Sequence, residues 1–400
     1  MRRPEWLTRN VAVLSGVSLL QDSASELLYP VLPILLTSVL GAPASVVGLV
    51  EGVAEGAAAL MKYLSGRLSD RIGRKPLVGL GYGLAAVGKV IVALSWAWPV
   101  VLVGRVVDRT GKGIRSAPRD ALLATDVPDK DLSRVFGFHR FADTGGAVIG
   151  PLLGLAVLAL ANGNIRVALW VAVIPAVLSA LLVGLAKDHP VAPSPTSSPS
   201  STSSPSSTSR PVVHVAPLPA AFKRVTVVLG LIALVNFPDA LVLLRVSETG
   251  FSTVGVVGVY VLYNLVYALV SYPAGVLTDR LPRPQVYALG LVCFSIGYLG
   301  LGLVDGGWAV VALMVVYGGF NGFTDGVGKA WISTLVPPAS RGRAQGVFQG
   351  LSGGAVLAAG LWAGLLWDVG PGQGVVPLLI SGSVAAVAAV GLWTAGARIR

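Results

Sequence analysis

Carboxylates recur at helical spacing within the apolar stretches of this sequence. Asp22 and Glu26 are four residues apart, as are Glu51 and Glu55, so each pair would lie on one face of a helix. A carboxyl group buried away from water holds a proton more readily than an exposed one, and can exchange it near neutral pH. These residues are therefore candidates for proton binding. The other candidate carboxylates are Asp108, Asp143, Asp239 and Asp325.

Basic residues occupy the same apolar stretches, and the largest group, five residues, falls within 99–121. Ionisable side chains are costly in the interior of a bilayer and rarely face lipid. They could neutralise the carboxylates as ion pairs that close a gate, or they could form a patch that binds an anion. Both interpretations stay open. The predicted cations of the central cavity are Lys89, Arg105, Arg109, Lys112 and Arg140.

The composition of the chain is typical of an integral membrane protein. Of the 400 residues, 54% are hydrophobic and 12% are charged, and the mean hydropathy is +0.75. Soluble domains carry about twice that charged fraction, so this chain cannot cover a water-exposed surface. The net charge of +11 does not indicate a nucleic-acid partner, because basic residues gather in short loops beside apolar runs. We therefore expect the lipid bilayer to surround the protein.

Apolar runs of about 20 residues, the length that crosses a bilayer as a helix, recur along the chain. We predict an all-α integral membrane protein with twelve transmembrane helices. The predicted helices span 11–39, 45–65, 76–95, 99–121, 135–161 and 166–186 in the first half, and 223–245, 252–275, 284–303, 308–333, 344–367 and 374–396 in the second. The 50 glycines would let such helices approach one another closely.

The chain contains an internal repeat at a constant offset. The polar stretch 66–76, GRLSDRIGRKP, returns in shorter form at 275–283 as GVLTDRLPR. Asp70 thereby corresponds to Asp279, which gives an offset of 279 − 70 = 209 residues. The offset persists further along the chain, and a fixed shift of this kind predicts two halves of similar structure.

The repeated stretch resembles the G-x-L-x-D-R-x-G-R-K signature of the major facilitator superfamily. The resemblance implies two six-helix pseudo-repeats around a central site, with alternating access. It also implies a latch between the halves on the cytoplasmic side, with Asp70 docked near Gly342 and Arg343. Orientation by loop charge alone would explain the basic residues but not the paired Gly and Asp. The latch candidates are Gly66, Asp70, Arg71, Gly73, Arg74, Gly275, Asp279, Arg280 and Arg343.

The predicted helix 135–161 carries a second family motif. Its stretch GAVIGPLLG, with Gly146, Gly150, Pro151 and Gly154, resembles the G-x-x-x-G-P-x-x-G motif of drug:proton antiporters in the superfamily. The glycines would form a flat packing face and the proline would bend the helix. Ordinary packing of small residues would explain the glycines alone. The stretch RTGKG resembles the family motif R-x-x-Q-G, but Lys112 replaces the usual Gln, which leaves a role in proton transfer open.

A stretch composed almost entirely of Ser, Thr and Pro separates the two halves. It has no apolar periodicity, which predicts a disordered tether, with a regulatory phosphorylation segment as the alternative. The predicted organisation is a six-helix bundle over 1–187, a cytoplasmic linker over 188–222 and a second six-helix bundle over 223–400.

The charge of the loops predicts the orientation of the chain. Lys and Arg residues gather in the loops on the side of the N-terminus, whereas the opposite loops hold Arg166 and, at a helix end, Arg245. Basic loops stay in the cytoplasm. We expect a multi-pass protein of the cell membrane (inner or plasma) with both termini in the cytoplasm.

These features favour one class of function over two others. The first hypothesis is a secondary active transporter that exports a small organic molecule in exchange for protons, a direction implied by the motif in helix 135–161. The second is proton-coupled uptake of an organic anion or a metal chelate, suggested by the cations of helix 99–121. A receptor or an enzyme is disfavoured, because the sequence has three His residues and no metal-ligand cluster. The sequence also has no nucleotide-binding loop, which argues against transport driven by ATP. We expect no enzymatic activity, cofactor or metal, and a monomer whose partners are a small-molecule substrate, protons and lipid.

Overall fold

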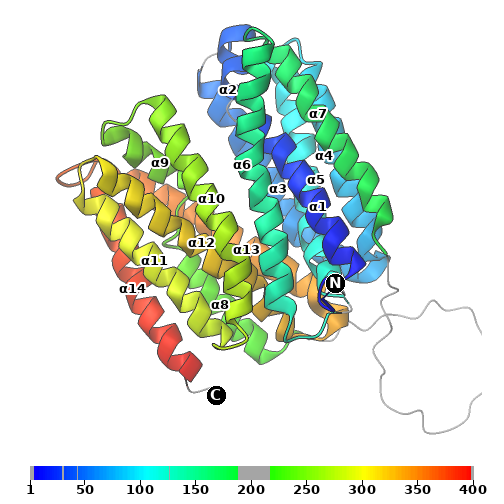
Figure 1. The fold of residues 1–400 in the computed structure, drawn as a ribbon, viewed down its shortest axis with the longest axis vertical. Helices are drawn as coiled ribbons and strands as arrows, with labels where there is room; N and C mark the ends of the chain where they lie inside the picture. Colours follow the sequence, from blue (N-terminus) through cyan, green and yellow to red (C-terminus); the bar gives the residue numbers. More distant parts are fainter. Residues whose placement is uncertain (1–3, 29–30, 43, 126, 188–216, 398–400) are drawn as a thin grey trace, which may run out of the picture.

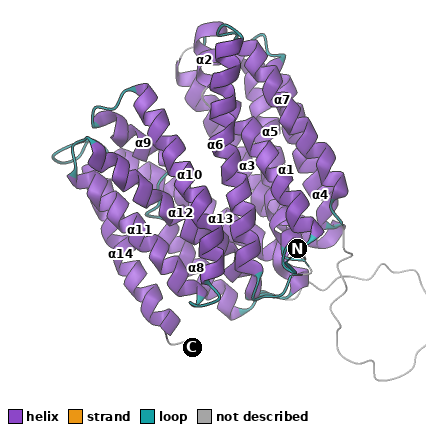
Figure 2. Cartoon of the chain, viewed as in Figure 1, coloured by secondary structure: helices purple, strands orange, loops and turns teal. Residues whose placement is uncertain are grey.

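The structure, a computed structural model, describes residues 4–28, 31–42, 44–125, 127–187 and 217–397. Helices are the regular elements of these residues (Figure 2), so the prediction of an all-α fold is confirmed. The predicted linker lies mostly outside the described residues. The second half begins its first helix at Ala220, inside the range predicted as linker.

The helices of each half follow one another with short connections. The first half consists of α1 (Arg9–Leu28), α2 (Val31–Ile34) with a π-helical turn (Leu35–Val39), α3 (Ala44–Ile72), α4 (Arg74–Ala93), α5 (Trp98–Leu123), α6 (Leu132–Leu160) and α7 (Ile165–Leu182) with a 3-10 turn (Val183–Leu185). The second half consists of α8 (Ala220–Ala233), α9 (Asp239–Glu248), α10 (Thr253–Leu277), α11 (Arg283–Leu303), α12 (Trp308–Thr334), a 3-10 turn (Pro338–Ser340), α13 (Arg341–Leu365) and α14 (Val375–Ala397).

Within the described residues, eight helices are long and apolar enough to cross a membrane. They are α4, α6, α7, α10, α11, α12, α13 and α14. The helix α5 is also long enough, but its many charged residues remove it from this group. The predicted count of twelve spans is therefore not confirmed by length and hydropathy, and it stays a prediction.

Three predicted boundaries differ from the structure. The stretch 66–72 continues α3 as helix instead of forming a loop, and the chain reverses at Gly73, whose φ of 96° suits glycine. The predicted helix 223–245 is broken between Ala233 and Asp239, because Pro238 disfavours helical geometry in the residue before it. The predicted helix 11–39 ends as α1 at Leu28, and residues 29–30 lie outside the described residues.

The two halves form two bundles that converge at one end (Figure 1). The first and the last described residues both lie at this end, which we call the terminal end; the opposite end is the distal end. The first half packs α1 against α6 and α4 against α5, and the second packs α11 against α12 and α14. Between the halves, α6 packs against α10 and α12, and α3 packs against α13.

Glycines make the close approach between the halves possible. A Cβ atom on Gly66 of α3 would lie 2.6 Å from the Cα of Gly346 on α13. A Cβ atom on Gly137 of α6 would overlap with the Ser271 carbonyl oxygen on α10. Real side chains almost never approach a backbone so closely, so both contacts depend on the missing side chain.

Candidate functional site

Four charged residues of the first half form a buried cluster. The amino group of Lys89 lies 2.9 Å from the Asp108 carboxylate, and the guanidinium of Arg105 lies 3.3 Å from the other oxygen of the same carboxylate. Arg105 also donates to both carboxylate oxygens of Glu51, at 2.7 and 2.8 Å. Helices α3, α4 and α5 are thereby joined by charge. Lys89, Arg105 and Asp108 are all buried, so these ion pairs satisfy groups that could not remain single in the membrane.

The other predicted charges of the first half are arranged more loosely. Arg109 pairs with Glu55 at 3.0 Å, and the Glu55 side chain is about half exposed. In the described part of the chain, the side chains of Asp22, Glu26 and Lys112 have no hydrogen bond or ion pair. These three half-buried side chains remain available for protons or for a ligand.

A second cluster joins the two halves. Lys329 of α12 lies 3.0 Å from the carboxylate of Asp120 on α5, and 3.5 Å from Asp325 on its own helix. Arg140 of α6 lies 2.6 Å from Asp325. Two ion pairs therefore hold the halves together. In one, the first half supplies the acid and α12 supplies the base; in the other, the first half supplies the base and α12 supplies the acid.

Further ion pairs in the first half fix the residues that make these contacts. Asp143 lies 2.5 Å from Arg140 and 3.6 Å from Arg119, and Arg119 lies 3.1 Å from Asp120. Ser18 of α1 donates to Asp143 and accepts from Arg119. Three carboxylates and three cations thus neutralise one another. We call this set the bridging network, and it consists of Arg119, Asp120, Arg140, Asp143, Asp325 and Lys329.

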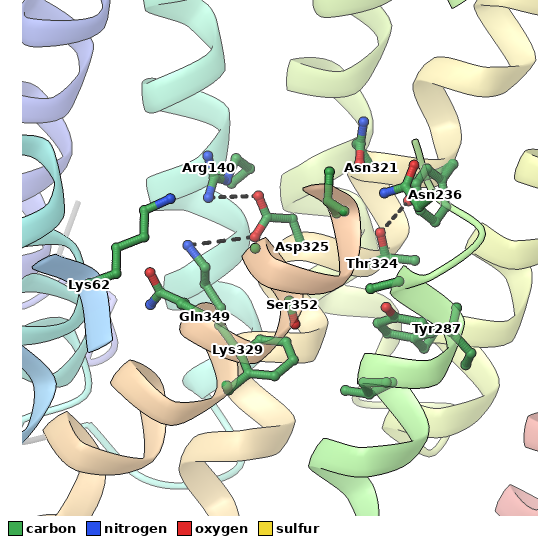
Figure 3. Close-up of a pocket in the computed structure, with 17 residues that line it drawn as sticks. Lys62, Arg140, Asn236, Tyr287, Asn321, Thr324, Asp325, Lys329, Gln349 and Ser352 are labelled. Carbon is green, nitrogen blue, oxygen red and sulfur yellow. Dashed lines mark hydrogen bonds and ion pairs between the residues drawn. The ribbon is translucent and has the colours of Figure 1, made fainter. Parts of the chain in front are cut away.

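A pocket of about 300 Å³ lies beside the bridging network (Figure 3). Its lining comes mainly from the second half, with polar groups such as Asn321 and Gln349 and an apolar side that includes Phe320. Lys62 and Arg140 are the first-half residues in the lining. The pocket therefore lies between the halves, in reach of charged groups from both.

In the second half, the phenol groups of two tyrosines hold the carboxylate of Asp239. Asp239 begins α9 after the helix break, and its carboxylate accepts hydrogen bonds from Tyr317 at 2.7 Å and from Tyr263 at 3.0 Å. Asn321 in turn donates to the Tyr263 oxygen. Among the described residues Asp239 has no ion pair, in contrast to Asp108, Asp143 and Asp325.

The first copy of the predicted latch lies at the terminal end. Gly66 packs against the first turns of α13, as described above, and Arg74 donates to the Pro338 carbonyl oxygen at 2.6 Å. Gly73 forms the turn between α3 and α4. The side chains of Asp70 and Arg71 lie outside the described residues, so the predicted docking of Asp70 stays a prediction.

The second copy of the latch makes the equivalent contacts with α6. A Cβ atom on Gly275 would lie 3.0 Å from the Cα of Arg134, and the Arg134 guanidinium forms an ion pair with Asp279. Arg280 is exposed and Arg343 is half-buried. The offset of 209 residues maps the Arg134–Asp279 pair onto Arg343 and Asp70.

The glycine motif of α6 packs against α1. A Cβ atom added to Gly146 would lie 2.6 Å from the Leu19 carbonyl oxygen, and one added to Gly150 would lie 2.6 Å from the Ser23 carbonyl oxygen. Gly154 continues this contact, and Pro151 is buried within α6. Gly146 and Gly150 also approach the Cβ atoms of Asp22 and Glu26, each at 2.9 Å. The motif therefore determines how close α6 comes to the two unpaired carboxylates.

Sequence reasoning missed several residues of the inter-half contact. Asp120 and Lys329 were not among the predicted site residues, although the repeat maps one onto the other, since 329 − 120 = 209. Residues that correspond in two pseudo-symmetric halves meet only near the symmetry axis, so this equivalence was a usable signal. Arg341, which donates to Asp129 at 2.7 Å across the halves, has no comparable signal in the sequence.

Comparison with known protein families shows which family this chain matches. The family model of the Major Facilitator Superfamily matches residues 14–261 and 232–398. An uncharacterised MFS-type transporter of Methanocaldococcus jannaschii is 32% identical over 372 residues, which cover 91% of this chain and 90% of the relative. The multidrug resistance protein MdtH of Photorhabdus laumondii is 29% identical over 126 residues, 32% of this chain and 31% of that protein.

A solved structure has the same fold. The human organic anion transporter MFSD10 superposes with a TM-score of 0.76 over 98% of this chain and 99% of its own. The sequence identity of 17% makes this a likeness of fold alone.

Proposed function

The chain belongs to the major facilitator superfamily, and we propose that it exports a small organic molecule in exchange for protons by alternating access. The proteins that it matches by family and by fold are transporters. A transporter of this architecture binds its substrate between two repeats and opens to one side at a time. The pocket between the halves supplies such a position.

The observation that carries the proposal is the bridging network beside this pocket. Its ion pairs join α12 to α5 and α6 at the terminal end, so this end cannot open while they persist. Asp325 belongs to the network and also lines the pocket. A proton on Asp325 would remove its attraction for Arg140 and Lys329, which would favour separation of the halves. Proton binding and opening are thus linked through one carboxylate.

The other carboxylates stay candidates for proton coupling. Asp22 and Glu26 have no ion pair in the described residues, and Asp239 is held by two tyrosines, so none of them is committed to a cation. Asp108 is the weakest candidate, because it is buried away from the pocket and both of its cationic partners belong to the first half.

Resemblance to known transporters supports export as the direction of transport. The glycine-proline motif of α6 is similar to that of drug:proton antiporters, and part of the chain is similar to a multidrug resistance protein. The cations of the pocket support a second candidate, proton-coupled uptake of an organic anion or a metal chelate. Loop charge supports insertion in the cell membrane with the terminal end in the cytoplasm.

Proton movement in reconstituted vesicles tests the proposal. The full chain is placed in vesicles with an acid lumen and a trapped pH dye, and pools of drugs, organic anions and iron chelates are added outside. We expect at least one pool to make the lumen alkaline with wild type, and no pool to do so with Asp325→Asn. Entry of a compound without any change in the dye signal would contradict proton antiport.

A further inference from the structure

The pocket between the halves carries more positive than negative charge. Its lining contains three cations, Lys62, Arg140 and Lys329, and one carboxylate, Asp325. Arg140 and Lys329 also pair with carboxylates behind the pocket wall, and the bridging network as a whole is neutral. The excess charge of the pocket therefore comes from Lys62.

Lys62 has no counter-ion in the part of the chain that the structure describes. Its side chain forms no hydrogen bond or ion pair there, and it points from α3 toward the middle of the pocket (Figure 3). Its charged neighbours include three cations, Lys112, Lys329 and Arg109, and one carboxylate of its own helix, Glu55. Asp325 is the carboxylate in the lining of the pocket. A cation among other cations at membrane depth is stabilised strongly by an added anion.

We propose that this pocket binds the acid group of a small organic anion between Lys62, Arg140 and Lys329. The proposal rests on the transport function proposed above and names the substrate class of that same site. The volume of about 300 Å³ suits a small molecule. Phe320, Phe348 and Ile232 line the same pocket and offer apolar contact to the body of the ligand.

The acid group would compete with Asp325 for the same two cations. Asp325 lies 2.6 Å from Arg140 and 3.5 Å from Lys329, and both cations face the pocket. An anion that takes Arg140 weakens the ion pair that Asp325 makes across the halves. When an anion crosses the membrane one way and a proton crosses the other way, both movements carry charge in the same direction. The membrane potential therefore adds to the driving force of this exchange.

Binding to the purified full chain tests this inference without transport. The probes are three molecules of similar shape, benzoate, benzamide and benzylammonium, and binding is measured by thermal shift and by quenching of tryptophan fluorescence. We expect benzoate to bind at least about ten-fold more tightly than the other two, as a charge-assisted contact provides. Lys62→Met should remove this preference, Lys62→Arg should keep it, and Lys223→Met, an exposed lysine at the start of α8, should leave it unchanged.

Two results would overturn the inference. One is equal or tighter binding of benzamide or benzylammonium to wild type, and the other is an undiminished preference for benzoate in Lys62→Met. The failure of this inference can be told from the failure of the transport proposal. Proton-coupled movement of neutral or cationic compounds that is unaffected by Lys62→Met would refute the anion site alone. Acid-selective binding with no transport in vesicles would refute the transport proposal alone.

Discussion

Replacing Asp120 with asparagine should weaken the closure of the terminal end. The Asp120 carboxylate is fully buried and accepts contacts from two residues of the other half, Lys329 at 3.0 Å and Gln349 at 2.9 Å. Its contact with Arg119 stays within α5 and is kept when the halves separate. The change to asparagine keeps the size of the side chain and removes its charge.

The size of the effect follows from the contacts between the halves. A hydrogen bond to a charged group stabilises a protein by about 1.5–3 kcal/mol, against about 1 kcal/mol for a neutral one. The asparagine oxygen can still accept hydrogen bonds from both partners, but it no longer offers Lys329 a negative charge, so we expect the closed form to lose about 2 kcal/mol relative to the open form. This loss changes the ratio of the two forms by about 30-fold.

Distances between spin labels measure this ratio directly. The single cysteine is first removed by Cys293→Ser, and labels are attached at Lys130→Cys and Lys223→Cys. Both lysines are exposed at the terminal end, one in each half. We expect a single short distance in the parent protein and an added longer distance in Asp120→Asn.

The matched control is Asp108→Asn on the same helix. Asp108 is also buried between two cations, but Lys89 and Arg105 both belong to the first half. This variant should lower the thermal stability without changing the label distance. Unchanged distances in Asp120→Asn, or the same shift in both variants, would refute the gating role of the bridging network.

Three further predictions concern the latch and the linker. Asp70→Asn should reduce transport in vesicles while membrane insertion stays normal, because the latch needs the carboxylate; a normal turnover rate would exclude this role. Gly275→Leu should force α10 away from α6 at a cost of about 1–3 kcal/mol, seen as a longer label distance, whereas Gly258→Leu on the same helix has free space and should behave as wild type. Replacing the Ser/Thr/Pro core of the linker by a Gly/Ser tether of equal length should leave transport intact, and a large loss would show that this segment does more than connect the halves.

The sequence predicted the parts of the fold that depend on local pattern. Apolar runs predicted the helices, and the repeat predicted that Gly66 and Gly275 have equivalent roles, as their contacts with α13 and α6 show. The break before Asp239 was missed, although Pro238 is visible in the sequence, because the apolar run continues across it. A hydropathy average does not detect that a proline lacks the backbone N–H donor of a helical hydrogen bond.

The partners of the charged residues could not be predicted in the same way. Asp325 has a cation on its own helix, Lys329, and a second one, Arg140, on α6. Only the packing of α6 against α12 decides that the second contact forms. The same holds for Lys62, because nothing in its spacing along α3 indicates that a pocket lined mainly by the second half lies beside it. The spacing of residues along one helix predicts which face of that helix each residue occupies, but it does not predict which other helix packs against that face.

The central claim, exchange of a substrate for protons, is tested most directly by the direction of accumulation under an imposed pH gradient. A labelled compound that triggers the proton signal is added to vesicles with an acid lumen, and its uptake is compared with that of empty vesicles and of vesicles treated with a proton carrier. The account predicts accumulation in the acid lumen that disappears when the gradient is collapsed. Accumulation in an alkaline lumen instead would identify proton-coupled uptake and contradict the account.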